Sequence, residues 1–306
     1  MMWIMRKKAV LRGMLYLAFF CLCFGGGRWA AERRAMETIA MQKEGKEGFL
    51  TIVIDDLGYS GEGTDEILAL PIPFTVAIMP FLECSDSDYQ KAVAAGKETM
   101  IHMPMESKAG YRAWVGEKGI FCTMSDEEIQ ARVREALETF PTAVALNNHM
   151  GSAIMEDKRC LGAIMDVVKE RDMIFLDSMT TPNSVAGEVS QAREVQLLRR
   201  NVFLDSTDDI EVVKKKLRQA GEVALQEGFA IAIGHVGPEG GNITAQAIRE
   251  VELELVEKGV TFLTVTEMRQ KMEIPITKDE EPISKDKEPI SKDEISEWEV
   301  PFSMQE

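Results

Sequence analysis

The sequence has few histidines, no closely paired cysteines after residue 23 and too little positive charge to balance its acids. Its 306 residues contain 35 lysines and arginines against 51 aspartates and glutamates, a formal net charge of −16. This acidic balance argues against a nucleic-acid backbone or an anionic lipid surface as the main partner. The five cysteines fit neither a disulfide framework nor a zinc-ribbon spacing, and we interpret the last three as ordinary buried thiols: Cys21, Cys23, Cys84, Cys122 and Cys160.

Hydrophobic residues make up 45% of the chain, which is enough to form a sizeable core. Short apolar runs of the kind found in strands covered on both faces occur at 49–55, 74–80, 99–105, 143–149, 173–178, 201–206, 229–235 and 261–267. Amphipathic helical stretches separate them, most clearly at 125–140, 209–228 and 243–259. Ser125 and Glu128 have the spacing of a capping box, and Gly228 and Gly259 are expected to end the other two helices.

Alternation of strands and helices predicts a parallel α/β sheet, either a TIM-like (β/α) barrel or an open doubly wound sheet. A glycine-rich phosphate-binding loop is missing after the first strand. Its absence favours the barrel, in a regular, irregular or seven-stranded form, and argues against a nucleotide-dependent enzyme.

The two ends of the chain differ from its centre. Four basic residues precede an apolar stretch at 13–27, which is typical of a signal peptide or an N-terminal membrane anchor over 1–27. Either one predicts an exported domain that is periplasmic, extracellular or anchored and facing outward. We expect a polar linker at 28–48, a folded domain at 49–274 and a disordered charged tail at 275–306, where the segment EPISKD is repeated.

Charged side chains and all three histidines of the sequence fall at predicted strand ends. Parallel α/β folds bind ligands at the carboxyl ends of their strands. Any one of these residues alone has a structural explanation, as a helix cap or a hydrogen-bonded core residue. Together they predict one site: Asp55, Asp56, His102, His149, Asp177 and His235.

An aspartate with two histidines is a ligand set for a catalytic divalent metal that keeps open positions for water and substrate. A second carboxylate beside the metal can accept a proton from that water, and a histidine across the pocket can protonate a leaving group. The adjacent pair Asp55 and Asp56 fits these two roles, and the pattern predicts metal-assisted hydrolysis.

Five segments in order resemble the divergent polysaccharide deacetylases, distant relatives of the NodB-type carbohydrate esterases. They are TIVIDDLGYS, GKETMIHMPMES, ALNNHMGS, FLDSMTTPNS and AIAIGHVGP, and the resemblance covers residues 49–273. It implies a deacetylase-type barrel and a cell-envelope polysaccharide or other N-acetylated sugar as substrate. It also implies a divalent metal, zinc first, with manganese, cobalt or iron as alternatives.

The resemblance also assigns roles to residues. Asp55 is implied as the base, His235 as the acid and Asp177 as the carboxylate that orients catalytic groups. Asp56 and His102 are implied as metal ligands. The second NodB motif is His-x-x-x-His, and this chain has Glu106 in place of its second histidine, so the third ligand is His149, which we favour, or Glu106.

Other residues are expected around this site. Glu106, Asn148 and Trp114 are candidates to contact substrate or to support a metal ligand. Tyr59 and Tyr111, with Trp114, could stack on a sugar ring. Two rival functions stay open: an envelope scaffold that keeps the fold without turnover, and a hydrolase of O-acetyl esters or of a peptidoglycan-linked amide. The sequence makes no prediction of oligomeric state.

Overall fold

The computed structural model describes residues 47–109, 112–237 and 240–273. The predicted export segment and charged tail lie outside these ranges, as does the linker up to residue 46. The first strand begins at Gly48, so the folded domain starts one residue earlier than expected. Among the described helices, none has the length and apolar character needed to cross a membrane.

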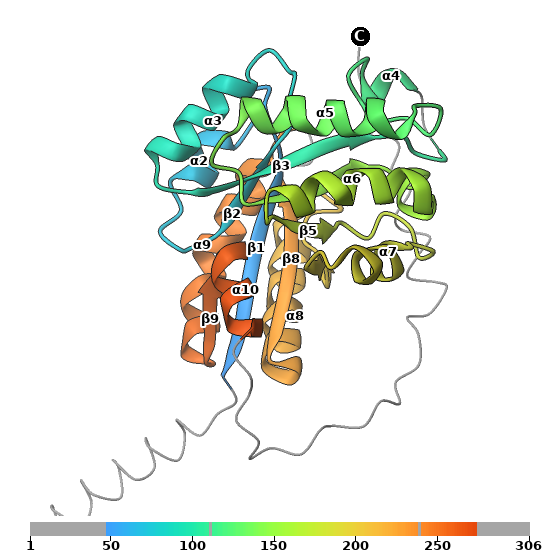
Figure 1. Cartoon of the computed structure of the whole chain (residues 1–306). Helices are drawn as coiled ribbons and strands as arrows, with labels where there is room; N and C mark the ends of the chain where they lie inside the picture. The colour runs from blue at the N-terminus through green and yellow to red at the C-terminus, as the bar shows by residue number, and fades with distance from the viewer. Residues whose placement is uncertain (1–46, 110–111, 238–239, 274–306) are drawn as a thin grey trace, which may run out of the picture. The chain divides into compact units, whose positions relative to one another are not determined.

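Parallel strands build one curled sheet in the described part of the chain (Figure 1). The strands are β1 (Gly48–Leu57), β2 (Thr75–Ile78), β3 (Glu98–Met105), β4 (Ala145–Met150), β5 (Ile174–Asp177), β6 (Leu197–Arg199), β7 (Val202–Phe203), β8 (Phe229–His235) and β9 (Val260–Leu263). Their order is β6-β5-β4-β3-β2-β1-β8-β7, with β9 added to β1. The path of paired strands ends at β6 and β7, so the predicted (β/α) barrel is confirmed in an incompletely closed form.

Helices connect most of the strands. They are α2 (Thr64–Leu68), α3 (Ser85–Ala94), α4 (Arg112–Val115), α5 (Asp126–Thr139), α6 (Lys158–Glu170), α7 (Ala186–Arg193), α8 (Ile210–Glu227), α9 (Gly241–Glu257) and α10 (Val265–Glu273), with a 3₁₀ turn at Ile154–Glu156. The capping box at the start of α5 is confirmed, and Gly228 ends α8 in the left-handed conformation.

Several expected strands are shorter than predicted, and one strand was missed. The run 201–206 pairs only at Val202–Phe203, and the short β6 before it was not predicted. The run 261–267 ends as a strand at Leu263 because Thr264 and Glu267 form a capping box that starts α10. The Thr264 N–H donates to Glu267 Oε2 at 2.9 Å, and the Glu267 N–H donates to Thr264 Oγ1 at 3.3 Å.

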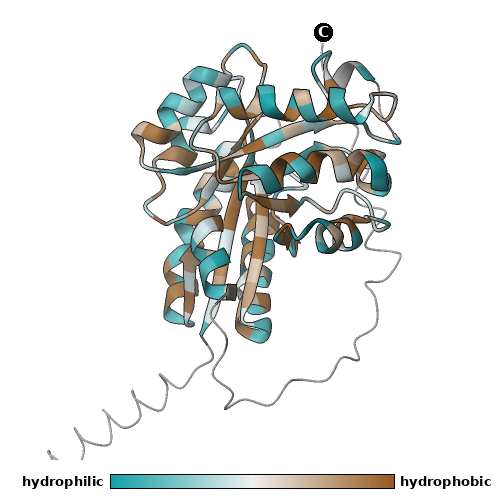
Figure 2. Cartoon of the chain, in the orientation of Figure 1, coloured by the Kyte–Doolittle hydropathy of each residue, from teal (hydrophilic) through white to brown (hydrophobic). Residues whose placement is uncertain are grey.

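Strand residues alternate between two apolar layers. On β1, Ile52 and Ile54 belong to the large cluster packed under the helices, whereas Val53 belongs to a smaller cluster inside the curl of the sheet. Figure 2 shows hydrophobic colour along β1 and β8 and both colours along the helices, as expected for strands covered on both faces. A polar side chain that faces the inside of the curl at a strand end is therefore directed into the site.

Candidate active site

Alternation along each strand decides which strand-end residues reach the interior of the curled sheet. On β3, Met100 belongs to the interior cluster, so His102 two residues later points the same way. The same alternation applies to two other strands. On β4, Ala145 faces the interior, and so do Asn147 and His149. On β8, Ile231 and Ile233 face the interior, and so does His235. The predicted convergence of the three histidines on one end of the sheet thus follows from strand geometry.

Asp55 and Asp56 are adjacent, yet both face the site. Val53 faces the interior, and Asp55, two residues later, faces the same way. Alternation alone would direct Asp56 toward the helices. The register of β1 against β2 shifts between Ile54 and Leu57, and Asp56 has a φ of 67°. This bulge with a left-handed residue turns the second carboxylate back into the pocket.

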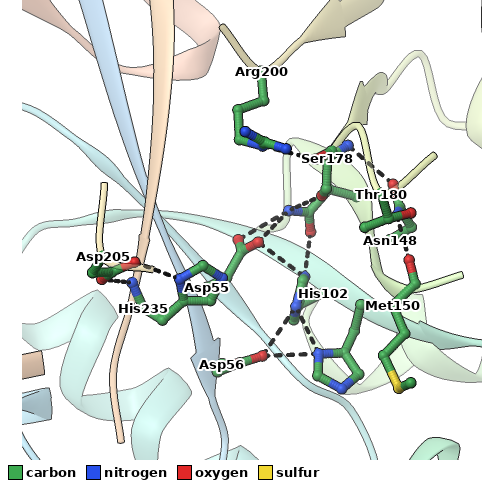
Figure 3. Close-up of polar contacts among 12 residues, drawn as sticks. Asp55, Asp56, His102, Asn148, Met150, Ser178, Thr180, Arg200, Asp205 and His235 are labelled. Carbon is green, nitrogen blue, oxygen red and sulfur yellow. Dashed lines mark hydrogen bonds and ion pairs between the residues drawn. The ribbon is translucent and has the colours of Figure 1, made fainter. Parts of the chain in front are cut away.

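Three candidate ligand atoms, one of them from Asp56, lie close together (Figure 3). Asp56 Oδ1 lies 2.9 Å from His149 Nδ1. It lies 3.1 Å from His102 Nε2, and Figure 3 marks this contact with a dashed line. The two imidazole nitrogens are 3.1 Å apart. Burial opposes ionisation of Asp56, but the two histidines outweigh it and hold the pKa of this carboxyl well below its usual range.

Asn147 settles which nitrogen of His102 carries the proton. The Asn147 Nδ2 donates to both Asp55 oxygens, at 2.9 and 3.0 Å, so its Oδ1 faces His102 Nδ1 at 2.8 Å. An amide oxygen only accepts, and Nδ1 is therefore the protonated nitrogen. The lone pair of His102 Nε2 then points toward Asp56, which is the tautomer a metal ligand needs.

A divalent cation fits this cluster. Asp56 Oδ1 is fully buried and has no hydrogen-bond partner, although two imidazole nitrogens lie within 3.1 Å of it. One ligand atom from each of Asp56, His102 and His149 lies within 4.8 Å of the other two. A buried acceptor facing ring nitrogens is stabilised by a cation placed among them.

Asp55 lies beside this cluster and is only 1% exposed. Burial raises the pKa of its carboxyl above the ordinary value, and His102 and His235 oppose that effect. A buried carboxyl with a raised pKa is suited to accept and release a proton during a reaction. Asp55 lies outside the candidate ligand set, and its role as the base stays a prediction.

His235 is held by Asp205, a residue that the sequence analysis missed. His235 Nδ1 lies 2.8 Å from Asp205 Oδ1. The other carboxylate oxygen accepts the His235 N–H and the Thr244 hydroxyl, both at 2.7 Å. This pair leaves His235 Nε2 directed away from Asp205 and stabilises the protonated ring.

Asp177 does not hold His235. Its oxygens accept the Met179 N–H at 2.8 Å and the Ser184 hydroxyl at 2.6 Å. On β5, Ile174 and Leu176 face the interior, so Asp177 falls on the opposite side of the strand. The carboxylate bonded to His235 thus belongs to Asp205, and the role of orienting catalytic groups that the resemblance implies for Asp177 stays a prediction.

Arg200 is a second residue that sequence reasoning missed. It is 7% exposed and follows Leu198 in the interior series. Its Nε donates to the Ser178 carbonyl at 2.8 Å and its Nη2 to the Met179 carbonyl at 3.1 Å. Burial lowers the pKa of its guanidinium to about 10, while the charges of Asp55 and Asp177 oppose that loss. Arg200 thus adds fixed positive charge to the field around Asp55.

The supporting residues have separate places. Glu106 Oε2 accepts the Cys122 N–H at 2.6 Å, and the candidate ligand set includes His149 instead. Asn148 accepts the Ser178 N–H at 3.0 Å and donates to the Met150 carbonyl at 2.7 Å, so it ties two strand-end loops together. Trp114 lies in α4, and Tyr111 falls outside the described residues.

Tyr59 contacts the chain rather than standing free as a stacking platform. Its hydroxyl lies 3.3 Å from the Val236 carbonyl. Its ring occupies the space that a side chain at Gly61 or Gly237 would need. These contacts hold the loop after β1 against the loop after β8.

Comparison with known proteins places these features in a family. An uncharacterized protein of Haemophilus influenzae is 33% identical over 212 residues, 69% of this chain and 75% of that protein. The uncharacterized protein YibQ of Escherichia coli is 32% identical over 191 residues, 62% of this chain and 59% of YibQ. The crystal structure of the uncharacterized protein ATU2773 from Agrobacterium tumefaciens C58 has the same fold, with a TM-score of 0.66 and 19% identity over 74% of this chain and 90% of that one.

The fold and site define an incompletely closed (β/α) barrel of the deacetylase type, with aspartates and histidines gathered at the carboxyl ends of its strands. The family model for divergent polysaccharide deacetylases matches residues 52–269. The chain belongs to that family, and the resemblance stated from its motifs is confirmed.

Proposed function

We propose that this protein is a metal-dependent hydrolase of the cell envelope that removes N-acetyl groups from a hexosamine-containing polysaccharide. The family supports the deacetylase class. The observation that carries the mechanism is that Asp56, His102 and His149 lie close together beside Asp55, a buried carboxyl outside the candidate ligand set. The basic and apolar N-terminal sequence supports an exported location, where such polymers lie.

Asp56, His102 and His149 would hold the metal, with zinc as the first choice and manganese, cobalt or iron as alternatives. When bound, the ion would supply an activated water and polarise the acetamide carbonyl. Asn147 fixes the tautomer of His102 and thereby keeps Nε2 available to the ion.

Asp55 and His235 would handle the protons. The register of β1 against β8 pairs Asp55 directly with His235, so the two groups flank one position in the site. Asp55 accepts the proton of the attacking water, and His235 donates a proton to the departing amine. Hydrolysis of the amide then yields acetate and a free amino sugar. Asp205 positions His235 and stabilises its protonated form.

Acetate release by the purified full chain tests this proposal. N-acetylglucosamine oligomers and peptidoglycan glycan strands would be incubated with metal-depleted protein, alone and after addition of zinc, manganese, cobalt or iron(II). We expect metal-dependent acetate release that falls by about 10²-fold or more in Asp55→Asn, since one proton transfer is lost. The matched control is Asp65→Asn, a change at an exposed aspartate of α2.

The assay also separates the rival functions. Release of acetate only from O-acetylated glycans would replace the amide substrate by an ester. Full metal occupancy with no hydrolysis of any acetylated glycan would refute the enzyme and support an envelope scaffold.

A further inference from the structure

A second group of candidate ligands lies apart from the catalytic cluster. Cys122 is in the connection between β3 and α5, Cys160 is in the first turn of α6, and Asp157 precedes that helix. One ligand atom of each lies within 4.8 Å of the other two. Cys160 is fully buried and Cys122 half-buried. Both are free thiols, as expected, but Cys122 is only half-buried and the two sulfurs lie close together.

The backbone fixes these donors in place before any ligand arrives. Asp157 Oδ1 accepts the N–H groups of Arg159 and Cys160, both at 2.9 Å, which caps α6. The Cys122 N–H donates to Glu106 Oε2 at 2.6 Å. Little rearrangement is needed to bring the two sulfurs and the carboxylate around one ion, which lowers the cost of binding.

Charge also favours a cation among these groups. Arg159 Nη2 lies 3.1 Å from Cys160 Sγ and donates to the Cys122 carbonyl at 2.8 Å. The Arg159 guanidinium is also paired with Asp126, at 2.6 Å, so it offsets only part of the three negative charges that two thiolates and one carboxylate would carry, and a divalent ion would offset the rest. Without such an ion, burial and the neighbouring carboxylates raise the pKa of both thiols, that of Cys160 to about 12, so both stay protonated.

We propose that Cys122, Asp157 and Cys160 form a second metal site that binds a thiophilic divalent ion, zinc in the native protein. Thiolate ligands select zinc over magnesium, calcium or manganese, and three protein ligands leave the fourth tetrahedral position to water. Binding releases the two thiol protons to solvent and transfers no electrons. The ion would join the β3–α5 connection to α6, which is a structural role separate from hydrolysis.

Cobalt(II) distinguishes this site from the catalytic one, because only thiolate ligands give sulfur-to-cobalt charge-transfer absorption in the near ultraviolet. The experiment would use the full chain with Cys21→Ser and Cys23→Ser, kept under a phosphine reductant. We expect the absorption at saturating cobalt to correspond to about one thiolate-bound ion per chain and to disappear in Cys122→Ser and Cys160→Ser. Zinc should displace the cobalt, whereas magnesium should not.

Matched variants serve as controls for this test. Cys84→Ser changes a half-buried thiol elsewhere and should leave the absorption unchanged. Asp56→Ala should also leave it unchanged, because that residue belongs to the other cluster. Asp157→Asn preserves the helix cap and should weaken cobalt binding about 10-fold or more through loss of an anionic ligand. Circular dichroism would establish that each variant is folded.

Three outcomes would overturn the proposal: no charge-transfer absorption in the reduced protein, absorption that persists in both cysteine variants, or absorption that depends on Cys84. The native protein could instead be isolated with a Cys122–Cys160 disulfide and fail to bind zinc after reduction. That result would show that the two cysteines form a disulfide and not a metal site. None of these outcomes bears on acetate release, so failure here is distinguishable from failure of the proposed hydrolase.

Discussion

The side-chain amide of Asn147 donates to both carboxylate oxygens of Asp55, at 2.9 and 3.0 Å, while its carbonyl faces His102. One amide thus connects the candidate base to a candidate metal ligand. Both ends of the amide are used, so rotation of the side chain would break both contacts. Asn147 was not among the residues expected from the sequence, although it directly precedes Asn148 and His149.

Replacement of Asn147 by alanine should weaken metal binding. His102 would lose the acceptor that keeps its proton on Nδ1, and loss of such supporting contacts costs about 10–100-fold in metal affinity. Competition with a chromophoric chelator measures the dissociation constant. Asn201→Ala is the control, since Asn201 only accepts the Ile231 N–H at the start of β8. Equal zinc affinity in wild type and Asn147→Ala would show that the amide does not set the tautomer.

Replacement of Asp205 by asparagine should impair proton donation by His235. The protonated ring is less stable without the carboxylate. The alkaline limb of the pH–activity profile should therefore shift to lower pH. We expect kcat to fall by about 10²–10⁴-fold, with a smaller change in KM. Thr244→Val removes only the hydroxyl that donates to the other oxygen of Asp205 and serves as the control. An unshifted alkaline limb would limit Asp205 to a structural role.

Gly63→Ala should destabilise the fold strongly because α9 leaves no space for a side chain there. Gly63 has a φ of 83°, and an added Cβ would lie 2.3 Å from the Gly241 carbonyl carbon. Gly228 has a similar φ of 88° with nothing within 4 Å, so Gly228→Ala isolates the cost of the backbone conformation, about 1–2 kcal/mol. Urea denaturation should give Gly63→Ala a loss of about 3 kcal/mol or more. Equal losses of unfolding free energy in the two variants would indicate that the backbones at Gly63 and Gly241 can move apart at little cost.

Loss of the α5 cap should have a moderate effect. The Ser125 hydroxyl accepts the Glu128 N–H, and the Glu128 carboxylate accepts the Ser125 N–H at 2.8 Å. Ser125→Ala should lower the free energy of unfolding by about 1 kcal/mol, whereas Ser125→Asp, which can still cap, should change it little. A thermal melt that is the same for both variants would argue that the cap contributes nothing.

The order of strands and helices was predictable because fully covered strands leave continuous apolar runs. The carboxylate that contacts His235 was not, because the tetrapeptide FLDS occurs twice, at 175–178 and at 203–206. In the first copy alternation turns the aspartate toward the helices, and in the second it turns Asp205 toward His235. Counting alternate residues from an interior anchor such as Leu176 would have separated the two copies.

Other features depend on tertiary context. The inward turn of Asp56 rests on a left-handed backbone and a one-residue bulge, which no local sequence rule assigns to an Asp-Asp pair. Arg200 follows a strand of three residues, too short to give a recognisable apolar run. The meeting of Cys122 and Cys160 joins segments that are 38 positions apart (160 − 122), and spacing alone does not indicate it.

The central position of β1 has a consequence for the order of folding events. Its neighbours are β2, encoded next to it, β8, encoded about 180 residues later, and β9, encoded about 210 residues later. Pairing at that separation is slow because a long chain segment must be closed before the contact is gained. A ribosome or a translocation channel that has released only the first 200 residues has delivered Asp55 and both candidate metal-binding histidines, but not His235. The chain therefore cannot complete its candidate active site until nearly the whole domain has emerged.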